Sequence, residues 1–268
     1  MEQSLDEIAE LAEDLGEHSL SKGKVNLVKI AKKEGIMLIF GHYGEYFLGQ
    51  LVHSSRRFYI HLNLDKLPDK TSARTRFTIA HELGHYFIDS HRINLSKGIS
   101  LSNGNTLIVK HIEKQANHFA SHLLMPKKNF IRSANKMESG LPAILALSNK
   151  YNTSIECTAI HYVSLNLIMG IMIKWHSDFS YHYSSYSSTF SKVVGIKGIP
   201  PIKFNPEYIK ELVITLDNSN NEYFETVTLV SRWVFTVIPS SEKDFVGLEQ
   251  SIKLGDFGGI TLLVFNIS

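Results

Sequence analysis

Two histidines and a glutamate stand close together in the segment His81-Glu82-Leu83-Gly84-His85. On a helix, positions i and i+4 lie on one face, so His81 and His85 could bind one metal ion while Glu82 acts on a water molecule beside it. A chain of this composition would contain the spacing by chance in roughly a few per cent of cases. The pattern indicates a metallohydrolase centre, and the surrounding residues must supply the helix and a third ligand.

The residues around the motif predict a helix over 74–88. Thr71 and Ser72 are residue types that favour the N-cap position, and the segment has no proline and no glycine except Gly84. Its apolar positions follow helical spacing: Phe77, Ala80, Gly84, Phe87 and Ile88. The alternative is a structural helix whose histidines are satisfied by hydrogen bonds alone. We disfavour it because burying two histidines and a glutamate without a metal leaves costly polar groups.

A catalytic zinc site needs three protein ligands and one open position, and two residues compete for the third place. His91 has the metzincin spacing from His81, but that pattern needs a glycine where this chain has Ile88. Glu113 lies in a segment with an apolar helical stripe that Pro126 should end. From its own surroundings Glu113 could be a solvated glutamate at a helix start, and only the pairing with the motif favours it as a ligand.

Two separate segments resemble the ImmA/IrrE family of metallopeptidases. They are residues 76–85 (RFTIAHELGH) and residues 113–126 (EKQANHFASHLLMP), and residues 25–36 and 58–63 are similar to the opening helix and strand of that family. The resemblance extends over about residues 22 to 130. It implies a zincin-like domain in which His81, His85 and Glu113 bind Zn²⁺, with Mn²⁺ as an alternative, and Glu82 is the general base. Family members often carry a histidine where this chain has Asp89, which we expect to be solvated.

The resemblance also implies a function, because the best understood members cleave helix-turn-helix repressors. We therefore expect a zinc-dependent endopeptidase with a specific protein substrate. In such an enzyme zinc activates a water molecule and polarises the scissile carbonyl, while Glu82 accepts the proton and passes it to the leaving amine. The sequence does not choose an oxyanion-stabilising residue among Tyr86, His111, His118 and His122. Two alternatives stay open: a non-proteolytic regulatory protein of peptidase fold that binds a partner or DNA, and a general peptidase.

Composition gives the cellular setting. The chain is 43% hydrophobic and 20% charged, with a formal net charge of +2, which is too small to argue for nucleic-acid binding. The single cysteine, Cys157, cannot form an internal disulfide. No apolar run has the length of a membrane span, and the first residues are acidic rather than those of a signal peptide. We expect a cytoplasmic protein without a membrane partner, and no feature predicts its oligomeric state.

We predict an α+β chain with three parts. Residues 1–135 should hold an acidic amphipathic helix over 1–15 and the peptidase-like domain. Residues 136–166 should form a helix-turn-helix-like segment, with helices at 142–150 and 155–165. The second of these helices has no lysine or arginine, so we favour a structural role over DNA reading.

Residues 167–268 should form a separate β-rich domain. A sensor-like role is one hypothesis for it, although no motif identifies a ligand. Strands are predicted at 168–175, 223–230, 233–237 and 258–265, with a hairpin turn at 218–221. A helix is expected at 206–212 or at 242–249. The tyrosine- and serine-rich stretch 181–190 is interpreted as an edge strand, a linker or a binding surface.

Overall fold

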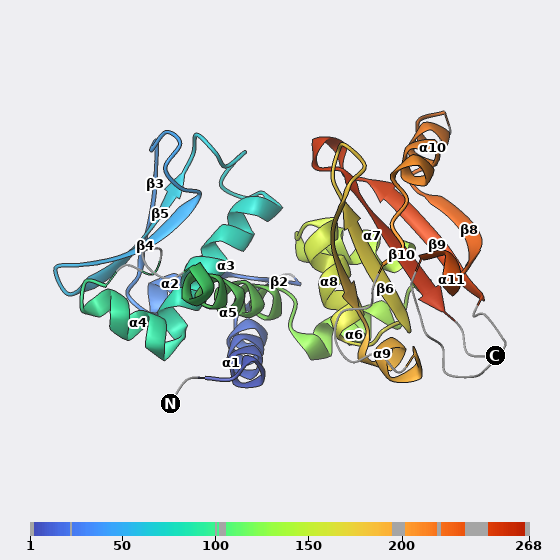
Figure 1. Ribbon diagram of the computed structural model, residues 1–268. Coiled ribbons are helices and arrows are strands. Elements are labelled where there is room, and N and C mark those ends of the chain that lie inside the picture. Colours follow the sequence, from blue (N-terminus) through green and yellow to red (C-terminus); the bar gives the residue numbers. More distant parts are fainter. Residues whose placement is uncertain are drawn as a thin grey trace. The chain divides into compact units, whose positions relative to one another are not determined.

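The computed structural model describes residues 3–21, 23–99, 101, 106–194, 202–218, 221–233 and 246–265 (Figure 1). The chain divides into two compact units. The first comprises Met1–Ser133 and Leu147–Ser154, and the second comprises Ala134–Ala146 and Ile155–Ser268. Across the described part of the chain, every helix is too short or too polar to span a bilayer. The predicted boundaries at 135 and 166 stay predictions.

The first unit combines helices with a small mixed sheet. Its helices are α1 (Leu5–His18), α2 (Leu27–Lys33), α3 (Ala73–Phe87), α4 (Asp89–Ser96), α5 (Thr106–Leu124) and α6 (Lys127–Ala134). Its strands are β1 (Leu20–Ser21), β2 (Lys24–Val25), β3 (Met37–Gly41), β4 (Gly49–Ser54) and β5 (Arg57–Asn63). In the three-stranded sheet, β5 is central, parallel to β3 and antiparallel to β4. Strand β4 is therefore an edge strand, with one side of its backbone unpaired by the sheet.

The predicted motif helix is α3, and local chemistry sets both of its ends. Ser72 is the N-cap, and its hydroxyl accepts a hydrogen bond from the Thr75 amide. Ile88 is extended, with φ −77° and ψ 114°, and separates α3 from α4. Its side chain is fully buried. The helix thus ends at Phe87, one residue earlier than predicted, because burying Ile88 turns the chain into α4.

Helix α5 is the second element of the predicted site, and it packs along both α3 and α1. It begins at Thr106, earlier than the sequence predicts, and ends at Leu124, before Pro126 as expected. Glu113 consequently lies inside the helix rather than at its start. The apolar stripe that faces the core is buried: Ala116, Phe119, Ala120, Leu123 and Leu124.

The two helices predicted after the peptidase-like domain are both present. They are α7 (Leu141–Tyr151) and α8 (Ile155–Ser164). Glu156 of α8 accepts a hydrogen bond from the Tyr183 hydroxyl, which ties this helix to a strand of the second unit. The acidic helix predicted at the N-terminus is α1, which begins with a capping box between Ser4 and Glu7.

The second unit contains the predicted β-rich region, a five-stranded antiparallel sheet in the order β7-β6-β10-β9-β8. The strands are β6 (Gly170–Trp175), β7 (Tyr181–Tyr186), β8 (Phe224–Leu229), β9 (Val246–Lys253) and β10 (Gly259–Phe265). Besides α8, the helical elements are α9 (Ser188–Val194), α10 (Pro206–Asp217), α11 (Val230–Trp233) and a 3₁₀ turn at Gly255–Phe257. The stretch 181–190 contains an edge strand, one of its three interpretations.

The structure differs from parts of the predictions for this region. The helix alternative at 242–249 is excluded from Val246 onward because these residues form β9, which pairs with β8 and β10; residues 242–245 lie outside the described chain. The helix expected at 206–212 is present as the longer α10. The hairpin turn at 218–221 is wrong because Asn218 is the C-cap of α10; residues 219 and 220 are outside the description. Trp233 ends α11 instead of starting a strand, and residues 234–237 are not described.

Candidate metal centre

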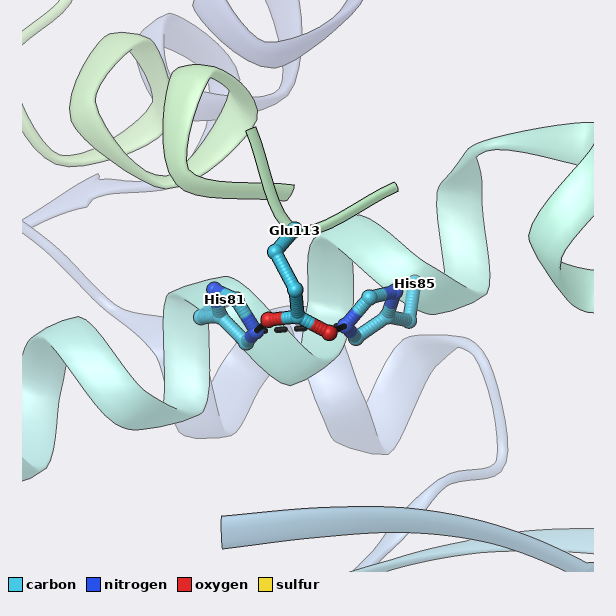
Figure 2. A group of neighbouring side chains, drawn as sticks. All are labelled: His81, His85 and Glu113. Atoms are coloured by element: carbon cyan, nitrogen blue, oxygen red, sulfur yellow. Dashed lines mark hydrogen bonds and ion pairs between the residues drawn. The ribbon is translucent and has the colours of Figure 1, made fainter. Parts of the chain in front are cut away.

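His81, His85 and Glu113 meet at one point between α3 and α5 (Figure 2). One ligand-type atom from each residue lies within 4.8 Å of the others. The Nε2 atoms of the two histidines are 3.1 Å apart. The Glu113 carboxylate lies 3.1 Å from His81 Nε2 through one oxygen and 3.7 Å from His85 Nε2 through the other. Among the described residues, no other group of three histidine, cysteine or acidic side chains is this close.

A close approach of the two helices allows Glu113 to reach the histidines. A Cβ atom on Gly84 would lie 3.2 Å from the Ala116 carbonyl oxygen and 3.2 Å from the Phe119 ring. Glycine at this position therefore lets α5 lie against α3 without displacing either residue. The sequence places Gly84 in the apolar stripe of the helix, and the structure adds that α5 is the element packed against it.

The ring of His81 is oriented by Asn117 of α5. His81 Nδ1 lies 2.9 Å from Asn117 Oδ1. An amide oxygen only accepts hydrogen bonds, so Nδ1 of His81 carries the hydrogen. The Nε2 atom of His81 then faces Glu113 and His85, and it offers them a lone pair when it carries no proton.

The ring of His85 is oriented by a longer chain of hydrogen bonds. His91 Nε2 donates to Gln115 Oε1 at 3.0 Å, which leaves His91 Nδ1 as an acceptor for His85 Nδ1 at 3.1 Å. Gln115 in turn donates to the Gln3 carbonyl at 3.3 Å. Burial lowers the pKa of both His91 and His85, the latter to about 3, so both rings are neutral. His85 Nε2 therefore also presents a lone pair to the same point.

These tautomers test whether the residues fit a metal ion. The Nε2 atoms of the two rings and the Glu113 carboxylate converge, which is the arrangement that a metal ion bound by all three side chains needs. Burial alone would lower the pKa of His81, but the hydrogen bond to Glu113 and the charges of Glu82 and Glu113 outweigh it and raise that pKa. The point thus attracts positive charge. The donor set of two imidazoles and one carboxylate fits zinc with an open fourth position.

His91, the other third-ligand candidate, lies on the opposite edge of the His85 ring from Glu113. Its side chain is 1% exposed and contacts Nδ1 of His85, not Nε2. The sequence points to His91 through metzincin spacing, but the structure places its ring against His85 Nδ1 and Gln115. Its contact depends on the turn at Ile88 between α3 and α4, which the motif does not encode.

Glu82 lies beside the three residues, held by strand β4. Its carboxylate accepts a hydrogen bond of 2.7 Å from the Leu51 amide, and the side chain is 5% exposed. Burial raises its pKa to about 7, against the lowering effect of the His81 charge and the Leu51 hydrogen bond. Gly49 gives the carboxylate room, since a Cβ there would lie 3.1 Å from Glu82 Oε1 and 2.4 Å from a Thr78 methyl group. The contact with Leu51 could not be found from the motif, because it joins the helix to a distant strand.

A cavity of about 380 Å³ opens onto these groups. Glu82, His81, His85 and Glu113 all line it. The β4 segment Gly49, Gln50 and Leu51 forms part of its wall, and the apolar side chains of Leu95, Leu101 and Val109 form another part. The cavity therefore combines a polar centre, an edge-strand backbone and an apolar wall.

The remaining sequence candidates lie away from this cavity. The Tyr86 hydroxyl donates to Glu34 at 3.4 Å, and His122 Nδ1 lies 2.7 Å from Glu13. Neither residue lines the cavity, and neither do His111 and His118. The Asp89 carboxylate is paired with Arg92 at 2.6 Å and is 61% exposed, so it contacts no ligand histidine. No oxyanion-stabilising residue is assigned.

Comparison with known proteins places the site in a family context. Residues 32–161 match the model of the IrrE N-terminal-like domain, a peptidase family. The whole chain is similar in fold to a Mycobacterium tuberculosis transcriptional regulator, with a TM-score of 0.60 and 13% sequence identity over 96% of this chain and 87% of that one. At this identity the likeness concerns fold only. No curated protein sequence matches the chain.

Proposed function

Because residues 32–161 belong to the ImmA/IrrE family of IrrE N-terminal-like peptidase domains, we propose that the protein is a zinc-dependent endopeptidase that hydrolyses a peptide bond in a specific protein. The observation that carries the proposal is the position of Glu82. Its buried carboxylate lines the same cavity as His81, His85 and Glu113 and is fixed by the Leu51 amide. A site that only held a structural metal would have no need of a fixed base beside an open cavity.

Each residue has a defined task in this proposal. His81, His85 and Glu113 hold the metal, with Asn117 and His91 orienting the two rings. Zinc held there would supply Lewis acidity, polarising the scissile carbonyl and making water a better nucleophile at neutral pH. Glu82 takes a proton from the attacking water on a carboxylate oxygen and then donates it to the leaving amine. Mn²⁺ is the alternative metal, since the same nitrogen and oxygen donors suit it.

The cavity walls suggest how a peptide is held. The free edge of β4 offers backbone groups with which an extended peptide could pair, while the Leu51 amide is already used by Glu82. Leu95, Leu101 and Val109 would contact an apolar substrate side chain next to the scissile bond. We therefore propose an extended substrate segment with an apolar residue at this position.

A helix-turn-helix transcriptional repressor is the proposed substrate, and its cleavage would relieve repression in the cytoplasm. The support is the family resemblance of residues 76–85 and 113–126. The general-peptidase alternative predicts cleavage of unrelated proteins. The non-proteolytic alternative predicts that regulation survives without Glu82. The helix α8 offers little for DNA reading, because it lacks lysine and arginine and Glu156 is bonded to Tyr183.

Co-production with candidate repressors tests the proposal, starting with the product of the neighbouring gene. The wild type should yield repressor fragments and induce a reporter gene, and Glu82→Gln should do neither. Glu45→Gln is the matched control, since Glu45 is exposed and lies outside the cavity. Reporter induction by Glu82→Gln without fragments would reject the peptidase proposal in favour of the binding alternative. Fragments from unrelated proteins at equal rates would reject the specific substrate.

A further inference from the structure

A second cavity in the first unit has a different chemical character. It has a volume of about 310 Å³ and is lined by residues from β1, β2, the start of α2, the segment before α3, the first part of α3 and Asn152. It shares no lining residue with the cavity of the metal centre. Three basic side chains, Lys24, Lys70 and Arg76, line it together with the apolar residues Val25, Leu27 and Ile79.

No acidic side chain among the described residues balances the positive charge in this cavity. No carboxylate lines the cavity, and within the described chain none of the three basic side chains forms an ion pair. Asp69, the acidic residue next to Lys70, directs its carboxylate to the amide and hydroxyl of Thr71. The side chains that line the cavity therefore carry three positive charges and no negative charge.

Arg76 is the most constrained of the three. One guanidinium nitrogen donates to the Val25 carbonyl at 3.1 Å, which fixes the orientation of the group. Its Nε atom is buried and has no hydrogen-bond partner. Burial lowers the pKa of Arg76, as expected for a cation that has lost water without gaining an anion. A buried unpaired donor costs free energy that an anionic ligand would recover.

The rest of the cavity indicates what kind of anion fits. A phosphate monoester carries up to two negative charges and three acceptor oxygens, so it can engage several cationic donors at once, which a single carboxylate does less well. Val25, Leu27 and Ile79 are nearly fully buried and offer an apolar surface for an organic body. The volume lies at the lower end of the range of small-molecule sites. We propose that this cavity binds a small organic phosphate ester, with its phosphate on Arg76, Lys24 and Lys70.

Isothermal titration of the full chain with three probes tests the proposal: phenyl phosphate, inorganic phosphate and phenol. Phenyl phosphate should bind with a dissociation constant of about 1 mM or lower, inorganic phosphate more weakly, and phenol not measurably. The readout needs neither a metal nor cleavage, so its failure would leave the peptidase proposal untouched. No binding of either phosphate would overturn the site. Equal affinity for both would overturn the assignment to an ester.

Variants locate the binding within the cavity. Lys24→Gln and Lys70→Gln should each weaken phenyl phosphate binding about tenfold, and Arg76→Gln more strongly. The two lysine variants carry the test if Arg76→Gln fails to fold. Within the described chain neither lysine side chain donates a hydrogen bond, and Lys70 Nζ lies over the Phe40 ring, 5.0 Å from its centroid. Lys29→Gln, an exposed lysine of α2 outside the cavity, should bind like the wild type. Unchanged affinity in Lys24→Gln and Lys70→Gln would contradict the proposal.

Discussion

The two histidines of the centre differ in how their rings are held. His81 depends on one amide, Asn117, whereas His85 depends on a chain of contacts through His91 and Gln115. Such partners fix the tautomer and the direction of a metal-binding ring. We therefore expect the metal affinity of the proposed site to depend on residues that would touch neither metal nor substrate.

We expect His91→Ala to lower zinc affinity by roughly 10- to 100-fold, because His85 loses the acceptor for its Nδ1 hydrogen. The measurement is a competition titration with a chromogenic chelator. His42→Ala is the control, since His42 is exposed and pairs only with Asp65 at the surface. If the His91 ring only filled space, His91→Phe would keep the zinc affinity of the wild type. If His91→Phe keeps wild-type affinity, the orienting role is wrong.

At the scale of elements, the approach of α5 to α3 controls whether Glu113 reaches the histidines. Gly84→Ala should be tolerated with a small loss of stability, because contacts of 3.2 Å with Ala116 and Phe119 need only a slight shift. Gly84→Leu should cost about 1–3 kcal/mol and weaken metal binding, because overpacking separates the helices. Urea unfolding and metal titration of both variants measure the series. Equal metal affinity in the wild type and Gly84→Leu would contradict this role.

The sheet of the second unit contains a buried acid that should make its stability depend on pH. Burial raises the pKa of Glu249, against the lowering effect of hydrogen bonds from Tyr208 and Trp233. Its folded pKa thus exceeds the ordinary value of 4.5, and the folded state retains a proton that the unfolded state releases. The contribution to the free energy of unfolding is largest below that ordinary value and falls as pH rises through the folded pKa.

Urea unfolding of the wild type and Glu249→Gln over a pH series measures this pH dependence of the free energy of unfolding. The wild-type stability minus that of the variant should decline as the pH rises from 4.5 and then level off. Glu222→Gln, at an exposed position, serves as the matched control. A difference that stays constant or grows with pH would exclude the raised pKa.

The elements that hold the ligands could be predicted from local signals. Ser72 as N-cap predicts the start of α3, and Pro126 predicts the end of α5. The histidine and glutamate side chains on these helices indicate metal binding. The supporting contacts could not be predicted, because Leu51 reaches Glu82 only through the register of a sheet formed with distant residues. The helix alternative at 242–249, where β9 lies, is wrong for a similar reason. Its polar Glu249 is buried by pairing and by Tyr208, so the strand lacks the alternation that would identify it.

At the scale of the whole molecule, metal should stabilise one of the two compact units. His81, His85 and Glu113 all belong to the first unit, so ligand binding should raise its free energy of unfolding by about 2.7 kcal/mol at a hundredfold excess over the dissociation constant. Chelation should lower the melting transition of the first unit and leave the second unchanged. Calorimetry of the wild type and His85→Ala, with and without zinc, measures this. If zinc shifted the melting temperature of His85→Ala by as much as that of the wild type, the metal would bind elsewhere.

In the proposed function, Glu82 and the metal centre hydrolyse a peptide bond. The most direct measurement is mass spectrometry of a candidate repressor incubated in heavy-oxygen water with purified, zinc-loaded protein. The wild type should create one new C-terminus that carries heavy oxygen, and Glu82→Gln should retain zinc while losing at least about a hundredfold in rate. An equal yield of labelled product from Glu82→Gln with the same metal content would exclude Glu82 as the general base of this hydrolysis.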